Sequence, residues 1–176
     1  MIRYVDHWRD NAASSWEDLA RTLGGSFAAR ARGLISPEMI LLTPDGEPFG
    51  RLTADEAGGT RLRTGGLAAR IEPRTSTTYT MTTGGDEILT AENAGSATTL
   101  TLRSGERAYE ASISLLRNSA VARSSAGKEA ARISGGLTNR RYRAAFDPQD
   151  PASLPITIFL LHRTFALRSS AFRTSP

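Results

Sequence analysis

Polar and apolar positions alternate in short runs over residues 38–146, and turn residues separate these runs. Around Leu100 and Leu102, the alternation with threonine and arginine has the period of two that is typical of a half-buried strand. Gly-Gly, Asp-Gly and similar dipeptides fall between the runs, at about the 8–12-residue spacing of hairpin-rich sheets. The pattern predicts eleven strands, at residues 39–43, 48–53, 60–64, 67–73, 77–82, 86–92, 98–103, 107–114, 118–124, 128–134 and 140–146. We therefore expect a mainly β fold built from antiparallel hairpins.

Residues 14–23 show the spacing of a short amphipathic helix. Four apolar side chains fall at positions i, i+3, i+4 and i+7, on one helix face: Trp16, Leu19, Ala20 and Leu23. Ser14 and Glu17 fit a capping box, and a Gly-Gly pair after the last apolar residue ends the helix. We expect helical character to resume over residues 26–32, so that residues 1–37 form a helical extension that packs on the sheet.

The segment from Leu154 to Leu161 is apolar on every side of a helical wheel. A strand is one interpretation, because isoleucine and phenylalanine favour strands. The expected N-cap at Ser153 and the polar residues after Leu161 favour a helix over residues 151–168. A helix that is apolar all round must be buried in protein or in a membrane. The apolar stretch is shorter than the roughly 20 residues of a membrane span, so we expect it to be buried in protein.

Only an enclosing sheet covers every side of one helix in a domain of this size. A helix with its side chains is about 10–12 Å wide, and a barrel of about eight strands has room only for its own side chains. Barrels of about eleven strands do enclose a helix. We therefore predict that residues 38–176 form a closed antiparallel barrel of about 11–12 strands around the C-terminal hydrophobic helix, with a short N-terminal amphipathic helix packed on it.

The composition removes several classes of site. The chain has no cysteine, which excludes disulfides, thiolate zinc sites and iron–sulfur clusters. Its two histidines, His7 and His162, are near opposite ends of the sequence, and neither a G-x-S-x-G motif nor a phosphate-binding glycine loop is present. We therefore expect no catalytic residue, no metal and no cofactor. The N-terminus lacks the apolar core of a signal peptide, so we expect a cytoplasmic protein without a membrane span.

The positive charge of the chain is concentrated in one segment. The 22 basic residues are 21 arginines and one lysine, and 18 acidic residues leave a net charge of +4. Residues 117–143 hold seven basic residues and one acid, Glu129, whereas residues 1–116 hold more acids than bases. A GC-rich genome also produces an arginine-rich composition, but the uneven distribution of the charge points to an anionic partner.

The last two predicted strands place four cations on one face if Tyr142 and Phe146 point into the barrel, because neighbouring side chains of a strand alternate. The candidate residues are Lys128, Arg132, Arg141 and Arg143. Together they would form a positive strip able to bind phosphate or another anionic group, with arginine suited to bidentate contacts. The alternative is a solvated face whose cations pair with Glu129 and other acids.

Two hairpin segments have related sequences: Asp45–Leu52 reads DGEPFGRL and Ala126–Ile133 reads AGKEAARI. A basic-aromatic strand, Arg140–Arg143, follows, and the hydrophobic helix comes after an Asp-Pro step. In order and style, over residues 38–168, these elements resemble the tubby-like superfamily of tubby C-terminal domains, phospholipid scramblases and LURP-one-related proteins. The resemblance implies a twelve-stranded barrel around a central hydrophobic helix, and anionic membrane lipids as ligands of some members. No D-x-D-x-D-G calcium loop is present, because Asp45 stands alone before its glycine.

These inferences predict a non-enzymatic, cytoplasmic tubby-like domain that binds anionic lipid headgroups or phosphate-bearing ligands through its basic face. With a lipid ligand, the protein would be peripheral at the membrane. The alternative is a structural or protein-interaction module with no small-molecule ligand, in which the N-terminal helix docks a partner. A small hydrolase with a site at the barrel mouth is a third hypothesis. Nucleic acid is a poor candidate ligand, because only Tyr142 accompanies the arginines as a stacking platform.

Overall fold

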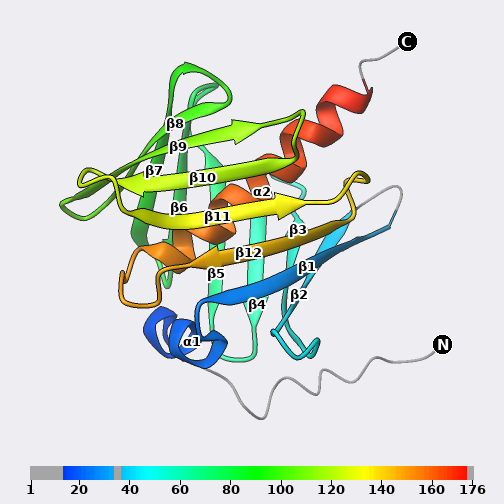
Figure 1. The fold of residues 1–176 in the computed structure, drawn as a ribbon, viewed down its shortest axis with the longest axis vertical. Helices are drawn as coiled ribbons and strands as arrows, with labels where there is room; N and C mark the ends of the chain where they lie inside the picture. The colour runs from blue at the N-terminus through cyan, green and yellow to red at the C-terminus, as the bar shows by residue number, and fades with distance from the viewer. Residues whose placement is uncertain (1–13, 34–36, 174–176) are drawn as a thin grey trace.

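The computed structural model describes residues 14–33 and 37–173, which form twelve strands and two helices (Figure 1). The helices are α1 (Trp16–Leu23) and α2 (Ser153–Arg173). The strands are β1 (Ser26–Arg32), β2 (Glu38–Leu42), β3 (Pro48–Ala54), β4 (Thr60–Thr64), β5 (Ala68–Pro73), β6 (Thr78–Thr83), β7 (Asp86–Ser96), β8 (Thr99–Ser104), β9 (Arg107–Ser114), β10 (Ser119–Ser124), β11 (Glu129–Gly135) and β12 (Arg141–Phe146). Each of the eleven predicted runs corresponds to one strand, from β2 to β12.

The strands form one closed barrel. Each strand pairs antiparallel with the next one along the chain, and β1 pairs with β12 to close the ring. In that closing pair Ser26 lies opposite Ala145, and Arg30 lies opposite Arg141. Closure leaves no free edge on the first or the last strand, which removes the usual liability of an exposed β edge. The predicted fold class is confirmed.

The expectation of a helix over residues 26–32 is wrong, because this segment is strand β1 of the barrel. Alanine and arginine favour helices, but pairing with β2 on one side and β12 on the other overrides this local preference. Phe27 and Ala29 point into the core, and Arg30 is exposed. Helix α1 is thus the described part of the expected N-terminal extension, whose residues 1–13 and 34–36 lie outside the described residues.

Helix α1 begins one residue later than the predicted capping box. Its N-cap is Ser15 rather than Ser14, and the Ser15 hydroxyl accepts a hydrogen bond of 3.1 Å from the backbone N–H of Asp18. Gly24 ends the helix with a positive φ of 67°, which glycine adopts without a steric penalty. The buried face of α1, formed by Leu19, Ala20 and Leu23, belongs to the hydrophobic core.

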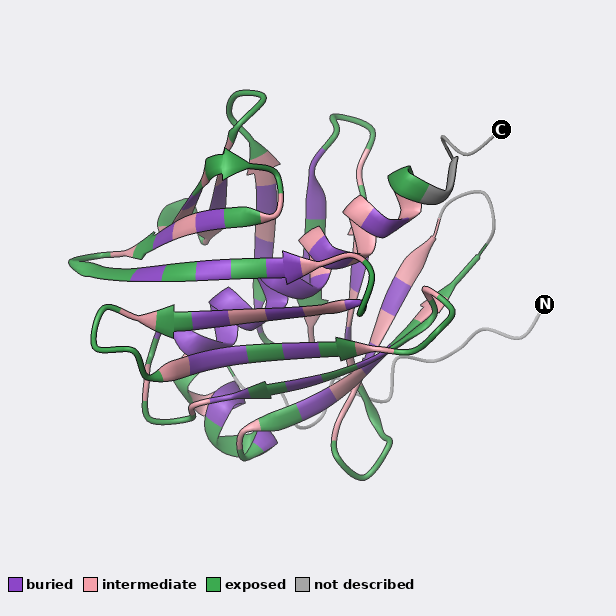
Figure 2. Ribbon diagram, turned by 45° about the horizontal axis from the view of Figure 1, so that its top comes forward, coloured by how far each residue is buried: buried purple, intermediate pink, exposed green. Residues whose placement is uncertain are grey.

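Helix α2 runs through the barrel, as predicted, and its first nine residues are buried on all sides (Figure 2). The apolar side chains of this part are at most 1% exposed: Leu154, Ile156, Ile158, Phe159, Leu160 and Leu161. Ser153 is the first helical residue and not the N-cap, because its hydroxyl donates to the carbonyl oxygens of Asp147 and Asp150. Neither described helix is long and apolar enough to cross a membrane.

The barrel has two ends, which we name by the course of α2. At the helix-entry end α2 begins, after the turn of residues 147–152, and α1 lies against this end (Figure 1). The indole N–H of Trp16 donates to the Thr83 hydroxyl there, at 3.0 Å. At the helix-exit end the last turns of α2 leave the barrel, next to the β9–β10 turn and the β11–β12 turn.

Candidate anion-binding site

Strands β11 and β12 alternate between buried and exposed side chains (Figure 2). Tyr142 and Phe146 of β12 point into the barrel, as do Ala131 and Ile133 of β11. The exposed cations of this hairpin include the four predicted ones: Lys128, Arg132, Arg141 and Arg143. The predicted orientation of the strip is therefore confirmed, and its binding role stays a prediction.

Two of the four cations are already neutralised by carboxylates. The Lys128 ammonium lies 2.7 Å from Oδ2 of Asp147, and this contact raises the pKa of Lys128 and lowers the pKa of Asp147. Arg132 donates to both carboxylate oxygens of Glu129, at 2.8 and 2.5 Å, which lowers the pKa of Glu129. These pairs follow the alternative interpretation, that of a solvated face whose cations pair with acids.

Arg141 and Arg143 have a different neighbour, which the sequence did not predict. Arg30 of β1 lies directly opposite Arg141 across the strand pair that closes the barrel, and Ala28 lies opposite Arg143. Within the described part of the chain, none of the three arginines forms an ion pair with a carboxylate. Like charges directly opposite each other destabilise an antiparallel pair. The three guanidinium groups therefore concentrate positive charge that nothing in the described protein balances.

The three arginines line a shallow groove of about 340 Å³ on the outer face of β1 and β12. The groove is lined by Ala28, Ala29, Arg30, Leu42, Ser134, Gly135, Gly136, Arg141, Tyr142 and Arg143. Most of the residues between the arginines are alanine, serine or glycine, so space remains for a ligand beside the guanidinium groups. We call this feature the arginine groove. It contains two of the four predicted site residues, Arg141 and Arg143, and adds Arg30.

The arginine groove contains donors but no acid or base for catalysis. Burial raises the pKa of Tyr142 to about 12, and its hydroxyl donates to the side-chain oxygen of Asn139. His162 lies on α2, and burial lowers its pKa to about 4, so its imidazole is neutral at pH 7. The described residues include no cluster of histidine and carboxylate side chains that could hold a metal ion. Chemically, the arginine groove can bind and orient an anion.

A second basic groove, over β4, β5 and β6, differs from the arginine groove because carboxylates lie beside two of its arginines. It is lined by Arg61, Arg63 and Arg70 among others. Asp55 lies 3.0 Å from Arg70 and 3.5 Å from Arg61, and Glu72 lies 2.7 Å from Arg70. Hydrogen bonds from the backbone of Gly59 and the charge of Arg70 lower the pKa of Asp55, so this carboxylate stays ionised. Two of the three cations of the second groove, Arg61 and Arg70, thus have carboxylate partners, whereas the three arginines of the arginine groove have none among the described residues.

Comparison with known proteins supports the fold and nothing finer. No protein-family model matches the chain, and no curated protein matches it in sequence. Among solved structures, the X-ray structure of an Arabidopsis thaliana protein, AT5G01750, is similar with a TM-score of 0.56. The likeness covers 78% of this chain and 90% of that chain, at 14% sequence identity. At this identity the likeness shows a shared barrel architecture alone.

Proposed function

We propose that this protein is a non-enzymatic, tubby-like barrel that binds a phosphate-bearing anion in the arginine groove, working in the cytoplasm. The proposal rests on one observation: Arg30, Arg141 and Arg143 line one groove and form no ion pair with a described carboxylate. A lipid headgroup and a soluble phosphate compound carry the same chemistry. The groove is suited to either.

The chemistry of the side chains supports phosphate as the recognised group. Guanidinium groups stay charged at every physiological pH and donate two parallel hydrogen bonds to a phosphate. Arg30 and Arg141 repel each other across the β1–β12 pair, and a bound dianion would turn this repulsion into two attractions. The same reasoning removes Lys128 and Arg132 from the proposed site, because Asp147 and Glu129 already accept their hydrogen bonds.

Calorimetric titration of the protein with inorganic phosphate and with inositol trisphosphate, at low salt, tests the proposal. We expect inositol trisphosphate to bind, and Arg141→Gln/Arg143→Gln to weaken that binding by at least about tenfold, since charge-assisted hydrogen bonds contribute about 1.5–3 kcal/mol each. The matched control is Arg103→Gln/Arg123→Gln, which removes the same charge from exposed positions on β8 and β10.

Two outcomes would contradict the proposal. Equal weakening by both double variants would mean that the titrated anion responds to net charge and not to the groove. Absence of binding at low salt would leave the protein as a structural or protein-interaction module, which is the alternative function. Thermal unfolding of each variant, followed by circular dichroism, separates lost binding from lost folding.

A further inference from the structure

We infer that the helix-exit end of the barrel is a membrane-docking face, on which two exposed leucines enter an anionic bilayer. The inference rests on the proposed function and deepens it, because it identifies the phosphate in the arginine groove as a lipid headgroup. The docking face consists of Leu116 and Arg117 on the β9–β10 turn, and Leu137 and Arg140 on the β11–β12 turn.

The two leucines are unusual for their exposure and for their position. Leu116 is 94% exposed and Leu137 is 99% exposed, and they are the only exposed large hydrophobic residues in the described part of the chain. A single exposed leucine needs no explanation. These two, however, occupy neighbouring turns at the same end of the barrel. The turns are joined by hydrogen bonds from the Asn118 amide to the Gly136 carbonyl, at 2.9 Å, and from the Gly135 N–H to the Asn118 carbonyl, at 2.7 Å.

Helix α2 holds both turns in place from inside. The guanidinium of Arg168, whose side chain is buried, donates to the carbonyl oxygen of Leu115 at 2.6 Å and to that of Leu137 at 3.1 Å. The Asn139 amide also donates to the Phe165 carbonyl of α2, at 3.2 Å. A buried cation that bonds the backbone of both turns fixes their course. The leucine side chains are therefore presented outward by a braced backbone.

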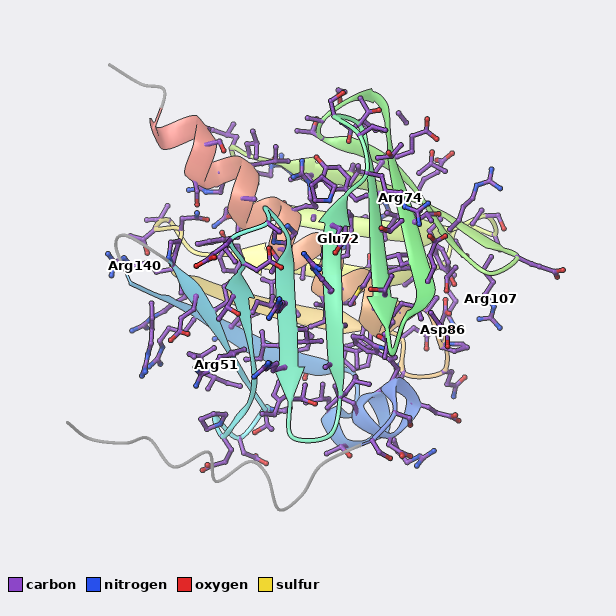
Figure 3. The ribbon with its side chains drawn as sticks, turned by 180° about the vertical axis from the view of Figure 1, so that it is seen from behind. Arg51, Glu72, Arg74, Asp86, Arg107 and Arg140 are labelled. Atoms are coloured by element: carbon purple, nitrogen blue, oxygen red, sulfur yellow. The ribbon has the colours of Figure 1, made fainter. Side chains whose placement is uncertain are left out.

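The charge around the leucines is positive. Within residues 111–128 and 130–146, and from residue 151 to the last described residue, the sequence has no aspartate or glutamate. Arg117 and Arg140 flank the two leucines, and Figure 3 shows Arg140 at the end of the barrel beside β1. Acids at the helix-exit end belong to other strands and turns, such as Glu56 on the β3–β4 turn. The docking face thus combines apolar tips with cations, a combination that complements an anionic lipid surface.

The shape of the face favours a bilayer over a protein partner. Leu116 and Leu137 are almost fully exposed and line neither of the two grooves described above, and a fluid interface receives such side chains without a preformed pocket. The arginine groove is continuous with this face, because Gly136 lines the groove and Leu137 follows it in the chain. A headgroup in the groove and leucines below the headgroup layer are therefore compatible with one orientation of the barrel.

Sedimentation with vesicles tests the inference. Wild-type protein is mixed with vesicles of phosphatidylcholine alone and with vesicles that also contain phosphatidylserine or a phosphoinositide. We expect binding to the anionic vesicles, and Leu116→Ser/Leu137→Ser to weaken it by at least about tenfold, because two apolar side chains lose their insertion. The same variant should bind inositol trisphosphate as tightly as the wild type does, because neither leucine lines the arginine groove.

A matched variant separates insertion at one end from general hydrophobicity. Ser125→Leu/Ala126→Leu, added to the double serine variant, restores two exposed leucines on the β10–β11 turn, at the helix-entry end. We expect no recovery of vesicle binding. As a direct probe of insertion, Leu137→Trp should be quenched by brominated acyl chains, and Ala126→Trp should not be.

The outcomes distinguish the two proposals. The docking face is wrong if the serine variant binds anionic vesicles like the wild type, or if leucines on the β10–β11 turn restore binding. In either case, arginine-dependent binding of inositol trisphosphate would still support the arginine groove as the anion site. Equal binding to neutral vesicles would overturn the role of the cations. If inositol trisphosphate does not bind at all, the proposed function fails first, and the inference fails with it.

Discussion

The start of α2 and the β1–β12 pair differ in whether carboxylates accompany their cations. At the helix-entry end, charges are paired: Lys128 with Asp147 at 2.7 Å, and Arg107 with Asp150 at 3.0 Å. Asp150 also accepts hydrogen bonds from the Tyr109 hydroxyl and from the backbone N–H of Ala152. These contacts tie β9 and the β10–β11 turn to the start of α2. The charges at this end stabilise the junction between barrel and helix.

At the helix-exit end the one buried cation, Arg168, bonds backbone carbonyls, and Arg30, Arg141 and Arg143 have no carboxylate partner among the described residues. Among the side chains labelled in Figure 3 are Arg107, at the helix-entry end, and Arg140, at the helix-exit end. The difference teaches that residue type alone does not identify a binding site in an arginine-rich protein. The partners that the fold supplies to each cation decide which of them are available to a ligand.

The largest effect is expected from the helix that the two ends share. Phe159 is buried within the barrel, with its ring centroid 5.9 Å from that of Tyr79. Phe159→Ala should lower the free energy of unfolding by about 3–5 kcal/mol, because it opens a cavity in the middle of the core. Urea denaturation followed by circular dichroism measures this. A loss below about 1 kcal/mol would mean that α2 is not the centre of the core.

The second effect is a loss in the free energy of unfolding at acid pH, caused by His162 of α2. Burial lowers the pKa of His162 from 6.5 to about 4, so the unfolded chain takes up a proton that the folded chain does not. The stabilising contribution of neutral His162 is therefore complete above pH 6.5 and is lost as the pH falls through about 4. The expected loss is on the order of 3 kcal/mol. Urea denaturation at several pH values, compared between wild type and His162→Leu, measures it. An unchanged pH dependence in the variant would assign the acid sensitivity to other groups.

The third effect is a loss at the helix-entry end. Asp150→Ala removes the acceptor of the buried Tyr109 hydroxyl and the hydrogen bond to the N–H of Ala152. We expect a loss of about 2–3 kcal/mol in the free energy of unfolding, because a buried hydroxyl is left without a partner. Burial and the contact with Asp150 raise the pKa of Tyr109 to about 12. In the variant, Tyr109 should therefore ionise at lower pH, as followed by tyrosinate absorbance. Unchanged titration would show that Asp150 does not hold the hydroxyl in solution.

The smallest of these effects is expected at the helix-exit end. Arg168→Met keeps an unbranched apolar stem and removes the hydrogen bonds to the Leu115 and Leu137 carbonyls. Both bonds are only partly buried, so we expect a loss of only about 1–2 kcal/mol. Amide hydrogen exchange should instead rise specifically in the β9–β10 and β11–β12 turns. Uniform exchange across the barrel would contradict the role of Arg168 as a brace for these turns.

Most of the fold could be predicted because the strand alternation and the apolar helix are strong local patterns. Strand β1 was missed although Phe27 and Ala29 alternate with Arg30, because alanine and arginine are also good helix formers and give a weak contrast between faces. Its pairing with β12 joins segments far apart in the sequence, and no local pattern reports such a partner.

The candidate site was predicted in part for the same reason. The outward direction of Arg141 and Arg143 follows from period two alone. Arg30 joins the candidate site because the barrel closes between β1 and β12. Lys128 leaves it because the turn after β12 places Asp147 beside the Lys128 ammonium. Both contacts depend on the tertiary structure. Arg30 could be assigned to the site from the sequence only by identifying the strand that pairs with β12.

The pairing of β1 with β12 also constrains how the protein folds. Every other strand pair joins neighbours in the chain and can form as soon as a hairpin is complete. The closing pair must wait for the twelfth strand, and the apolar segment that fills the interior follows that strand in the sequence. The barrel therefore cannot be both closed and filled before this last hydrophobic segment is present. We expect closure of the ring around α2 to be the last step of folding, a non-local event of the kind that makes β proteins fold slowly.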